Sequence, residues 1–464
     1  MATAAIAFPD DSFLGHPRGL AYLAFAEAFE RFSFYGMQTL LVLYMATTLL
    51  NPGHVEHIAG FAGFRAGIEA LYGRPLSVTA LGSAIFGAYA GLVYLTPIAG
   101  GMIADRWLGR TRTITLGALL MTGGHFLMAF EASFLLALAC LVTGVGMFKG
   151  NMAAQVGGLY APADLRRADA FQIYSLIFSC GAIAAPLVAG TLGEVYGWHY
   201  GFAAAGIGMI CGLGIYLAGR RYLPADVVTR SDHAAAPAMT RRERRAVILL
   251  VALLPVLAVG VIGNMQIFNA YLLWARRDAN LVLFGHVMPT SWLVSIDAAV
   301  SVGFIVVVLG FWRWWAQRRS MPAEITKMTI GLGFAVLALL ALAAGAGFAN
   351  SGISSAGKVG IGWLLAFHVL NSIGMANYIP VGLALYARAA PRALSGTMIG
   401  IFYMHLFLAN NLVGWLGGLI EWMPPTQFWL LHAGLTAAAG MVLLVVARLF
   451  GAVLAPTALE DESG

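Results

Sequence analysis

Several ionisable side chains of this sequence lie inside long apolar segments. Glu27, Glu30 and Arg31 share one segment at spacing i, i+3 and i+4, which places all three on one face of a helix. Lys149 lies in a second apolar segment and Asp297 in a third. Charged groups are costly in lipid, so they usually face the interior of a helix bundle or a water-filled cavity. These residues therefore predict a pathway for an ion or a charged substrate.

The charges of the first four residues suggest a proton switch. The negative charges of Glu27 and Glu30 balance the positive charges of Arg31 and Lys149 if the two segments that hold them lie side by side. One added proton leaves the group net positive, which favours the binding of an anionic group such as a substrate carboxylate. By linkage, that binding raises the proton affinity of the carboxylates. The arrangement predicts coupled uptake; the alternative is a static salt-bridge cluster that sets helix register.

These charges belong to an unusually apolar chain. Of its 464 residues, 60% are hydrophobic and 10% are charged, whereas an ordinary soluble domain carries about 25% charged residues. The apolar residues come in runs of about 20 to 30, the length that an α-helix needs to cross a bilayer. We predict an all-α integral membrane protein with twelve transmembrane helices at residues 20–49, 78–104, 112–130, 133–158, 168–193, 200–221, 246–275, 293–316, 328–347, 358–387, 396–422 and 427–453.

A polar stretch in the middle of the chain contains Pro224 and a basic cluster that begins at Arg241. Such a composition is typical of a linker, and this one separates six predicted helices from six others. The predicted organisation is a cytoplasmic N-terminal tail (1–19), an N-terminal six-helix bundle (20–221), a cytoplasmic linker (222–245), a C-terminal six-helix bundle (246–453) and a cytoplasmic C-terminal tail (454–464).

The distribution of basic residues predicts the orientation of the helices. With twelve spans, most of the 27 Lys and Arg residues fall in the two tails and in loops on the same side of the membrane. Basic loops stay in the cytoplasm, so both termini are expected there, in a multi-pass protein of the cytoplasmic (inner) membrane. The basic residues form no single patch, which argues against a nucleic-acid partner. The three cysteines lie inside apolar segments and are interpreted as packing residues.

Four segments together resemble a known family. Residues 27–36 read EAFERFSFYG, which resembles the ExxER signature of the proton-dependent oligopeptide transporters within the major facilitator superfamily. Three more segments agree in order: GGMIADR at 100–106 with Gly109 and Arg110, GMFKGN at 146–151, and YGWHYGF at 196–202. The resemblance is dense in the N-terminal half and thin in the C-terminal half.

The resemblance implies the major facilitator fold, with two six-helix bundles around a midplane cavity, alternating access, and an inward proton gradient as the driving force. The residues that it implies in proton coupling are Glu27, Glu30, Arg31 and Lys149. The positions that it implies at the substrate are Arg31, Tyr35, Tyr94, Lys149, Ser179, Met375 and Phe402, with Lys149 near the peptide carboxylate and the two tyrosines lining the cavity.

A loop after the second predicted helix resembles the gating loop of the superfamily. Asp105, Arg106 and Arg110 stand where an Asp and Arg residues latch the cytoplasmic ends of helices. The same charges also fit an ordinary cytoplasmic loop. We assign them to gating and not to substrate binding.

Several positions depart from the family pattern at the substrate end. Met375 stands where a Glu of the family holds the peptide amino group, Ser179 where an Asn bonds the peptide backbone, and Phe402 where a Trp is usual. Asp297 falls where the family tends to have Asn. Our hypothesis is that the Asp297 carboxylate replaces the missing amine anchor; the alternatives are a second proton site or a structurally paired acid. His368 and other lone histidines in apolar spans are interpreted as hydrogen-bonding groups.

The predicted function is proton-coupled symport that imports di- and tripeptides across the cytoplasmic membrane by alternating access. Its predicted partners are small peptides, protons and the lipid bilayer, with no cofactor, no metal site and a monomeric state. The alternative is a divergent proton-coupled carrier of another small carboxylate, an anion or a sugar, because Met375 removes the amine anchor. A membrane-embedded enzyme is less favoured because the sequence lacks HExxH, GxSxG and P-loop motifs, and no catalytic residues are assigned. A channel would show a repeated filter sequence or rings of like charge.

Overall fold

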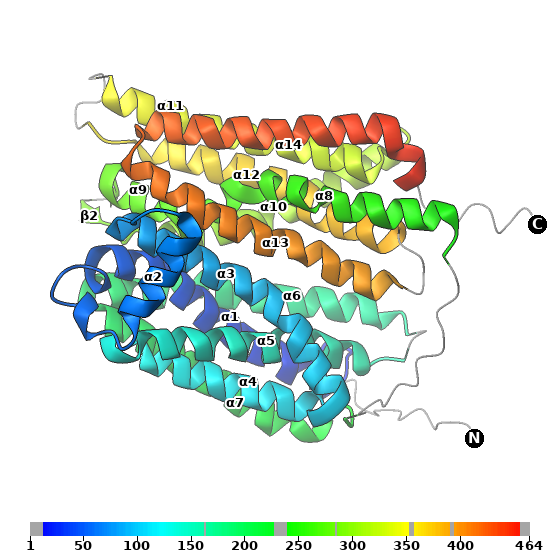
Figure 1. Cartoon of the computed structure of the whole chain (residues 1–464). Coiled ribbons are helices and arrows are strands. Elements are labelled where there is room, and N and C mark those ends of the chain that lie inside the picture. The colour runs from blue at the N-terminus through cyan, green and yellow to red at the C-terminus, as the bar shows by residue number, and fades with distance from the viewer. Residues whose placement is uncertain are drawn as a thin grey trace, which may run out of the picture. The chain divides into compact units, whose positions relative to one another are not determined.

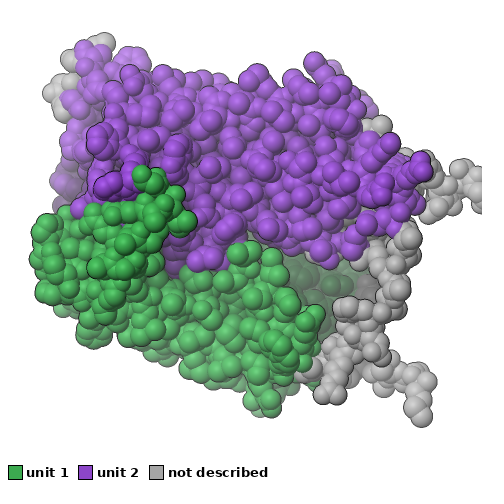
Figure 2. Space-filling model, viewed as in Figure 1, with its two compact units in different colours: residues 1–73, 95–231 green, residues 74–94, 232–464 purple. Residues whose placement is uncertain are grey.

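The computed structural model describes residues 13–161, 164–226, 239–283, 285–351, 357–389 and 394–454, and most of these are helical (Figure 1). The chain divides into two compact units, which Figure 2 distinguishes by colour. Unit 1 comprises residues 1–73 and 95–231, and unit 2 comprises residues 74–94 and 232–464.

Unit 1 is built from helices that pair through close contacts. Its helices are α1 (Arg18–Tyr44), α2 (Phe61–Tyr72), the second part of α3 (Val78–Ile103), α4 (Arg110–Leu127), α5 (Phe134–Gly158), α6 (Arg166–Ala185) and α7 (Trp198–Gly219). Helix α1 packs against α6 and α7, and α4 packs against α5. A Cβ atom added at Gly181 of α6 would lie 2.0 Å from the backbone oxygen of Ala28 on α1. Glycine at this position therefore lets α6 approach the turn of α1 that carries Glu27 and Glu30.

Short π- and 3₁₀-helical turns extend or connect these helices. The π-helical turns are η1 (Met45–Leu49), η3 (Ala104–Leu108), η5 (Pro186–Gly190) and η6 (Leu192–Tyr196); the 3₁₀ turns are η2 (Val55–His57), η4 (Glu131–Ser133), η7 (Arg220–Tyr222), η8 (Gln266–Phe268) and η10 (Gly418–Glu421). Pro186 begins η5 directly after α6. A proline lacks the N–H that a regular helix needs, which explains the change of helix type there.

Unit 2 contains the remaining long helices and one small hairpin. Its elements are the first part of α3, α8 (Arg241–Met265), α9 (Ala270–Asp278), β1 (Val282–Leu283), β2 (His286–Val287), α10 (Trp292–Ala316), α11 (Glu324–Asn350), α12 (Ile361–Ala389), α13 (Ser395–Gly417) and α14 (Pro425–Leu454). The two strands pair antiparallel. A hydrophobic core joins side chains of α8, α11, α12, α13 and α14.

The prediction of an all-α membrane protein is confirmed. Ten helices of the described chain are long and apolar enough to span a membrane. The other two of the twelve expected spans correspond to α1 and α4, both of which carry charged residues. In α1 these charges are the predicted cluster at Glu27, Glu30 and Arg31, which lie in the middle of the helix and are buried.

Two predicted boundaries differ from the structure. The span expected at 246–275 is interrupted: α8 ends at Met265, and α9 begins after η8 and Asn269. The backbone N–H of Ala270 at the start of α9 donates to Gln266 Oε1 at 3.2 Å, and the side-chain amides of Gln266 and Asn269 donate to the backbone oxygen of Val413 on α13.

The second difference is the division of α3. The sequence predicted one bundle over 20–221, whereas residues 74–94 belong to unit 2. A Cβ atom added at Gly87 would lie 2.5 Å from the backbone oxygen of Asn410 and 2.7 Å from Cα of Gly414, so α3 lies directly on the backbone of α13. Residues 1–12 of the predicted N-terminal tail, 227–238 of the predicted linker and 455–464 of the predicted C-terminal tail lie outside the described residues.

Candidate functional site

The charged turn of α1 forms a buried ion-pair cluster. Arg31 Nη2 lies 2.5 Å from Glu27 Oε1, and Arg31 Nε lies 3.5 Å from Glu30 Oε2. The relative exposure of these residues is 2% for Glu27, 0% for Glu30 and 8% for Arg31. The i, i+3, i+4 spacing produces this arrangement because residues three and four apart lie on the same helix face. One guanidinium is thus shared by two carboxylates inside the bundle.

Helices α5 and α6 bring further groups to this cluster. Lys149 Nζ on α5 lies 5.1 Å from the ring centroid of Phe34, one turn after Arg31, and the guanidinium of Arg31 lies 5.5 Å from the ring of Phe178 on α6. Lys149 is within electrostatic range of Glu27, Glu30 and Arg31. The expectation that the segments of Arg31 and Lys149 lie side by side is therefore confirmed, and unit 1 brings the four charges together.

The carboxylates of this cluster are incompletely hydrogen-bonded. Among the described residues, neither oxygen of Glu30 nor Oε2 of Glu27 has a hydrogen-bond donor. A buried acceptor without a donor is costly. These carboxylate oxygens can therefore still accept a proton or a hydrogen bond from a ligand.

The tyrosines and Ser179 occupy different surroundings. The phenols of Tyr35 and Tyr174 lie within electrostatic range of the Arg31 guanidinium. Ser179 follows Phe178 on α6, and its hydroxyl donates to the backbone oxygen of Ser175 at 2.7 Å. Tyr174 reaches the cluster from α6, although no sequence motif indicated a role for it.

Three predicted substrate positions belong to unit 2, where they contact its hydrophobic core. Tyr94 is partly buried against that core, Met375 is 8% exposed, and Phe402 is 0% exposed. The ring of Phe402 packs against Tyr386 at 5.1 Å between centroids. Their roles at the substrate stay predictions, and Met375 of α12 belongs to the hydrophobic core of unit 2.

Asp297 has a partner that the sequence did not predict. Its Oδ1 lies 2.9 Å from His368 Nδ1, and His368 Nε2 lies 2.8 Å from the hydroxyl of Tyr271. The three residues come from α10, α12 and α9. The sequence shows only that each is a polar residue in an apolar segment. Their contact depends on how the three helices pack. The structure therefore favours a paired acid over an unpaired anchor for an ammonium group.

The predicted gating residues lie around η3. Asp105 Oδ1 is 3.6 Å from Arg110 Nη2, and both side chains are exposed. Arg106 is also exposed. Gly109 connects η3 to α4 with φ of 76°, a conformation that favours glycine.

The sequence did not predict a role for Asp226, whose carboxylate lies at the start of α4. Asp226 accepts from the backbone N–H of Thr111 at 3.0 Å and from its hydroxyl at 3.0 Å, which caps the start of α4. Gln155 of α5 donates to the Thr111 hydroxyl, and Tyr216 of α7 donates to Gln155 at 3.0 Å. This network joins three helices of unit 1 to the chain after η7. Asp226 lay in the predicted linker, so its sequence position indicated no site.

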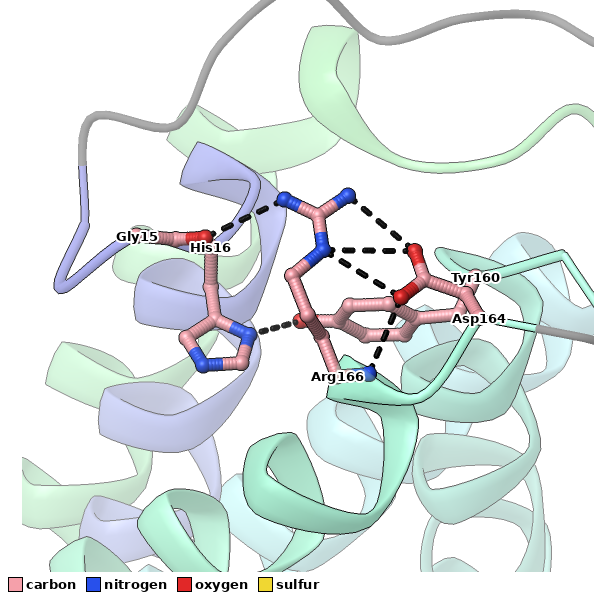
Figure 3. A network of polar contacts seen from close by, with 5 residues as sticks. All are labelled: Gly15, His16, Tyr160, Asp164 and Arg166. Atoms are coloured by element: carbon pink, nitrogen blue, oxygen red, sulfur yellow. Dashed lines mark hydrogen bonds and ion pairs between the residues drawn. The ribbon is translucent and has the colours of Figure 1, made fainter.

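A further polar network joins the starts of α1 and α6 (Figure 3). His16 Nδ1 lies 2.9 Å from the Tyr160 hydroxyl, while Arg166 pairs with Asp164 at 3.0 Å and donates to the backbone oxygen of Gly15. Hydrogen bonds from the side chain and backbone of Arg166 lower the pKa of Asp164. Burial raises the pKa of Tyr160 to about 12. The network holds the segment before α1 against the loop between α5 and α6.

Long apolar helices around a buried cluster of mixed charges define a multi-pass membrane transporter. The family comparison gives the particular class: the POT family model matches residues 111–231 and 227–430. The chain belongs to the POT family.

Similar proteins and structures agree along nearly the whole chain. The peptide transporter YePEPT of Yersinia enterocolitica is 28% identical, over 94% of this chain and 95% of the relative. A di-/tripeptide transporter of Lactococcus lactis subsp. lactis is 27% identical, over 95% and 97%. A crystal structure of a peptide transporter POT with sulfate is 26% identical, covers 95% of this chain and 96% of that one, and has a TM-score of 0.82. The predicted family and the predicted major facilitator fold are confirmed.

Proposed function

We propose that this protein is a proton-coupled symporter that imports di- and tripeptides by alternating access. The observation that carries the proposal is the buried cluster of Glu27, Glu30, Arg31 and Lys149 in unit 1. The peptide transporters of Yersinia and Lactococcus support the substrate class. Since these relatives are transporters, the chain is assigned to transport and not to an enzymatic reaction.

The coupling step uses a charge imbalance in the cluster. When Glu30 takes up a proton, the positive charges of Arg31 and Lys149 face the single negative charge of Glu27. The net positive cluster then attracts the carboxylate of a peptide. After the peptide leaves on the cytoplasmic side, Glu30 loses its proton and again pairs with Arg31. By linkage, proton and peptide each favour the binding of the other.

The proposal extends to the membrane and to the other predicted residues. The protein lies in the cytoplasmic membrane with both termini inside, which the excess of basic residues in loops on that side supports. It works as a monomer. The proton gradient is the driving force, and no cofactor takes part. The proposed substrate positions are Tyr35, Tyr94, Ser179, Met375 and Phe402, and the proposed gating residues are Asp105, Arg106 and Arg110. The Asp105–Arg110 ion pair supports this last assignment.

A second candidate function is transport of another small carboxylate. It is favoured by the surroundings of Met375, which lies in an apolar core, and by the engagement of Asp297 with His368. Met375 has no carboxylate, and the carboxylate of Asp297 is already engaged by His368, so neither residue offers an ammonium group an unoccupied anion. A substrate that needs the cationic cluster but no amine anchor would fit these observations.

The test is uptake of labelled dialanine into liposomes that contain the purified protein, with an imposed inward proton gradient. We expect uptake that an ionophore abolishes and that Glu30→Gln reduces to the ionophore level, because Gln cannot exchange the proton. Full gradient-driven uptake by Glu30→Gln would contradict the coupling role of Glu30. Uptake of lactate-type carboxylates without uptake of dialanine would favour the second candidate function.

A further inference from the structure

The buried histidines of the described helices differ in what surrounds them. Neither ring nitrogen of His125 has a hydrogen-bond partner among the described residues, and Nε2 of His405 has none there either. His432 Nε2 lies 3.0 Å from the Gln266 amide nitrogen, and its Nδ1 lies 2.8 Å from the Phe428 oxygen. Because the amide donates, Nε2 of His432 must accept and its Nδ1 carries the hydrogen. The hydrogen bonds therefore fix His432 in a neutral form.

His368 differs because it faces a carboxylate on one side and a hydroxyl on the other. Its Nδ1 lies 2.9 Å from Asp297 Oδ1, and its Nε2 lies 2.8 Å from the Tyr271 hydroxyl. The side-chain exposure is 0% for His368 and 13% for Asp297. Helices α9, α10 and α12 thus hold a chain of hydrogen bonds whose acidic end is partly accessible.

The hydrogen bonds of His368 are compatible with both of its protonation states. In the neutral state, Nδ1–H donates to Asp297 and Nε2 accepts from the Tyr271 hydroxyl. In the imidazolium state both nitrogens donate, and the Tyr271 hydroxyl rotates to become the acceptor. Loading the proton changes the Asp297–His368 pair from a net negative to a neutral pair. The contacts given above for His125, His405 and His432 provide no carboxylate for this purpose.

We propose that His368, held between Asp297 and Tyr271, is a second proton-binding site of the transport cycle. The proposal rests on the proposed function, in which the cluster on α1 is the first site. It places the second site in unit 2 and assigns Asp297 to the imidazole instead of to a peptide ammonium group. One of the protons that accompany the substrate is then carried at His368.

Among the described residues, the ionisable groups that hydrogen-bond to His368 are Asp297 and Tyr271. Phe367 stacks on Tyr271, and Trp429 of α14 packs against the same ring, with His432 beyond it. The charged residues of the other packed helices lie near helix ends: Glu324 and Lys327 on α11, Arg448 on α14, and residues 241–245 on α8. These groups are separated from His368 along their helices.

The first test is direct proton binding by the purified full-length protein in detergent, without substrate. Between about pH 8 and about pH 5, the range in which histidines change charge, we expect His368→Gln to take up about one proton fewer than the unchanged protein. Glutamine can still donate to Asp297 and accept from Tyr271. The matched control is His432→Gln, which should take up as many protons as the unchanged protein. Equal proton uptake by all three proteins would overturn the proposal.

A second variant keeps the test valid if His368→Gln does not fold. Tyr271→Phe preserves the aromatic packing but removes the acceptor of the imidazolium N–H. We expect the same proton to bind at lower pH, because hydrogen bonds to charged groups are stronger than those to neutral ones. An unchanged proton-uptake curve for Tyr271→Phe would contradict the assignment.

The number of protons per peptide tests the role in transport. In liposomes, the peptide gradient that balances a known proton gradient gives this number, and we expect it to fall by about one in His368→Gln and to be unchanged in His432→Gln. An unchanged number in His368→Gln would overturn the role in the cycle. If the unchanged protein shows no gradient-driven uptake, the proposed function fails, whereas the proton-binding measurement still decides whether His368 binds a proton.

Discussion

At the scale of single residues, Arg31 and Lys149 have different tasks although both are cations of one cluster. Arg31 is held by two carboxylates, at 2.5 Å from Glu27 and 3.5 Å from Glu30. Lys149 lies against the ring of Phe34 and comes from another helix. A planar guanidinium suits a fixed position between two carboxylates, whereas a flexible ammonium can follow a ligand. We therefore expect Lys149 to be the more mobile cation and the first to meet a substrate carboxylate.

Replacing Lys149 by Gln should remove that attraction. The remaining cluster of Glu27, Glu30 and Arg31 is then net negative until a proton binds. We expect gradient-driven uptake to fall about thirtyfold or more, because loss of one partner from a buried charge pair costs about 2 kcal/mol or more. Uptake assays at several peptide concentrations measure this loss. The control is Lys327→Gln, which removes a cation of α11 in unit 2, and uptake by Lys149→Gln equal to that control would exclude the role.

The same scale shows how far the site could be predicted. The spacing of Glu27, Glu30 and Arg31 is local, so helix geometry alone places them together. By contrast, Asp297 and its partner His368 are 71 residues apart in the sequence, and His368 and Tyr271 are 97 residues apart. No local rule connects such residues, because their contact is set by the packing of α9, α10 and α12. The acid could be found from its cost in lipid, but its partners could not.

At the scale of elements, small residues determine which helices can meet at the cluster. Ala28, between Glu27 and Glu30, lies under α6, where a Cβ atom at Gly181 would be 2.0 Å from its backbone oxygen. By contrast, nothing lies within 4 Å of a Cβ atom added at Gly214 of α7. The apolar lengths of the helices were readable from the sequence, but the interruption after Met265 was not. It contains neither Gly nor Pro, and buried amides at Gln266 and Asn269 stabilise it.

Substitution of Gly181 by Ala should therefore separate α1 from α6. We expect a loss of about 1–3 kcal/mol of stability, typical of overpacking, with a parallel loss of proton-driven uptake because Arg31 and Phe178 move apart. Gly214→Ala should be neutral or stabilising by up to about 1 kcal/mol, since alanine favours a helix. Thermal unfolding in detergent compares the two variants. Equal melting temperatures would show that α6 does not depend on the close approach at Gly181.

At the scale of the whole molecule, the charge carried per cycle distinguishes the two candidate functions. The cluster in unit 1 has two acids and two cations, so one proton is needed before a substrate carboxylate meets a net positive site. A zwitterionic peptide that moves with one proton carries a net positive charge inward. A monovalent carboxylate that moves with one proton carries none. The membrane potential therefore acts on the first reaction and not on the second.

We predict that an inside-negative potential increases peptide accumulation even without a pH difference. One elementary charge moved through 100 mV is worth about 2.3 kcal/mol, which corresponds to an increase in the accumulation ratio of about fortyfold. A potassium gradient with valinomycin sets the potential in liposomes, and the ratio of internal to external peptide is measured at equilibrium. A proton carried at His368 would steepen this dependence, and His368→Gln would return it to the one-charge slope. An accumulation ratio that does not change with the membrane potential would contradict peptide–proton symport. It would fit an anion that enters with one proton.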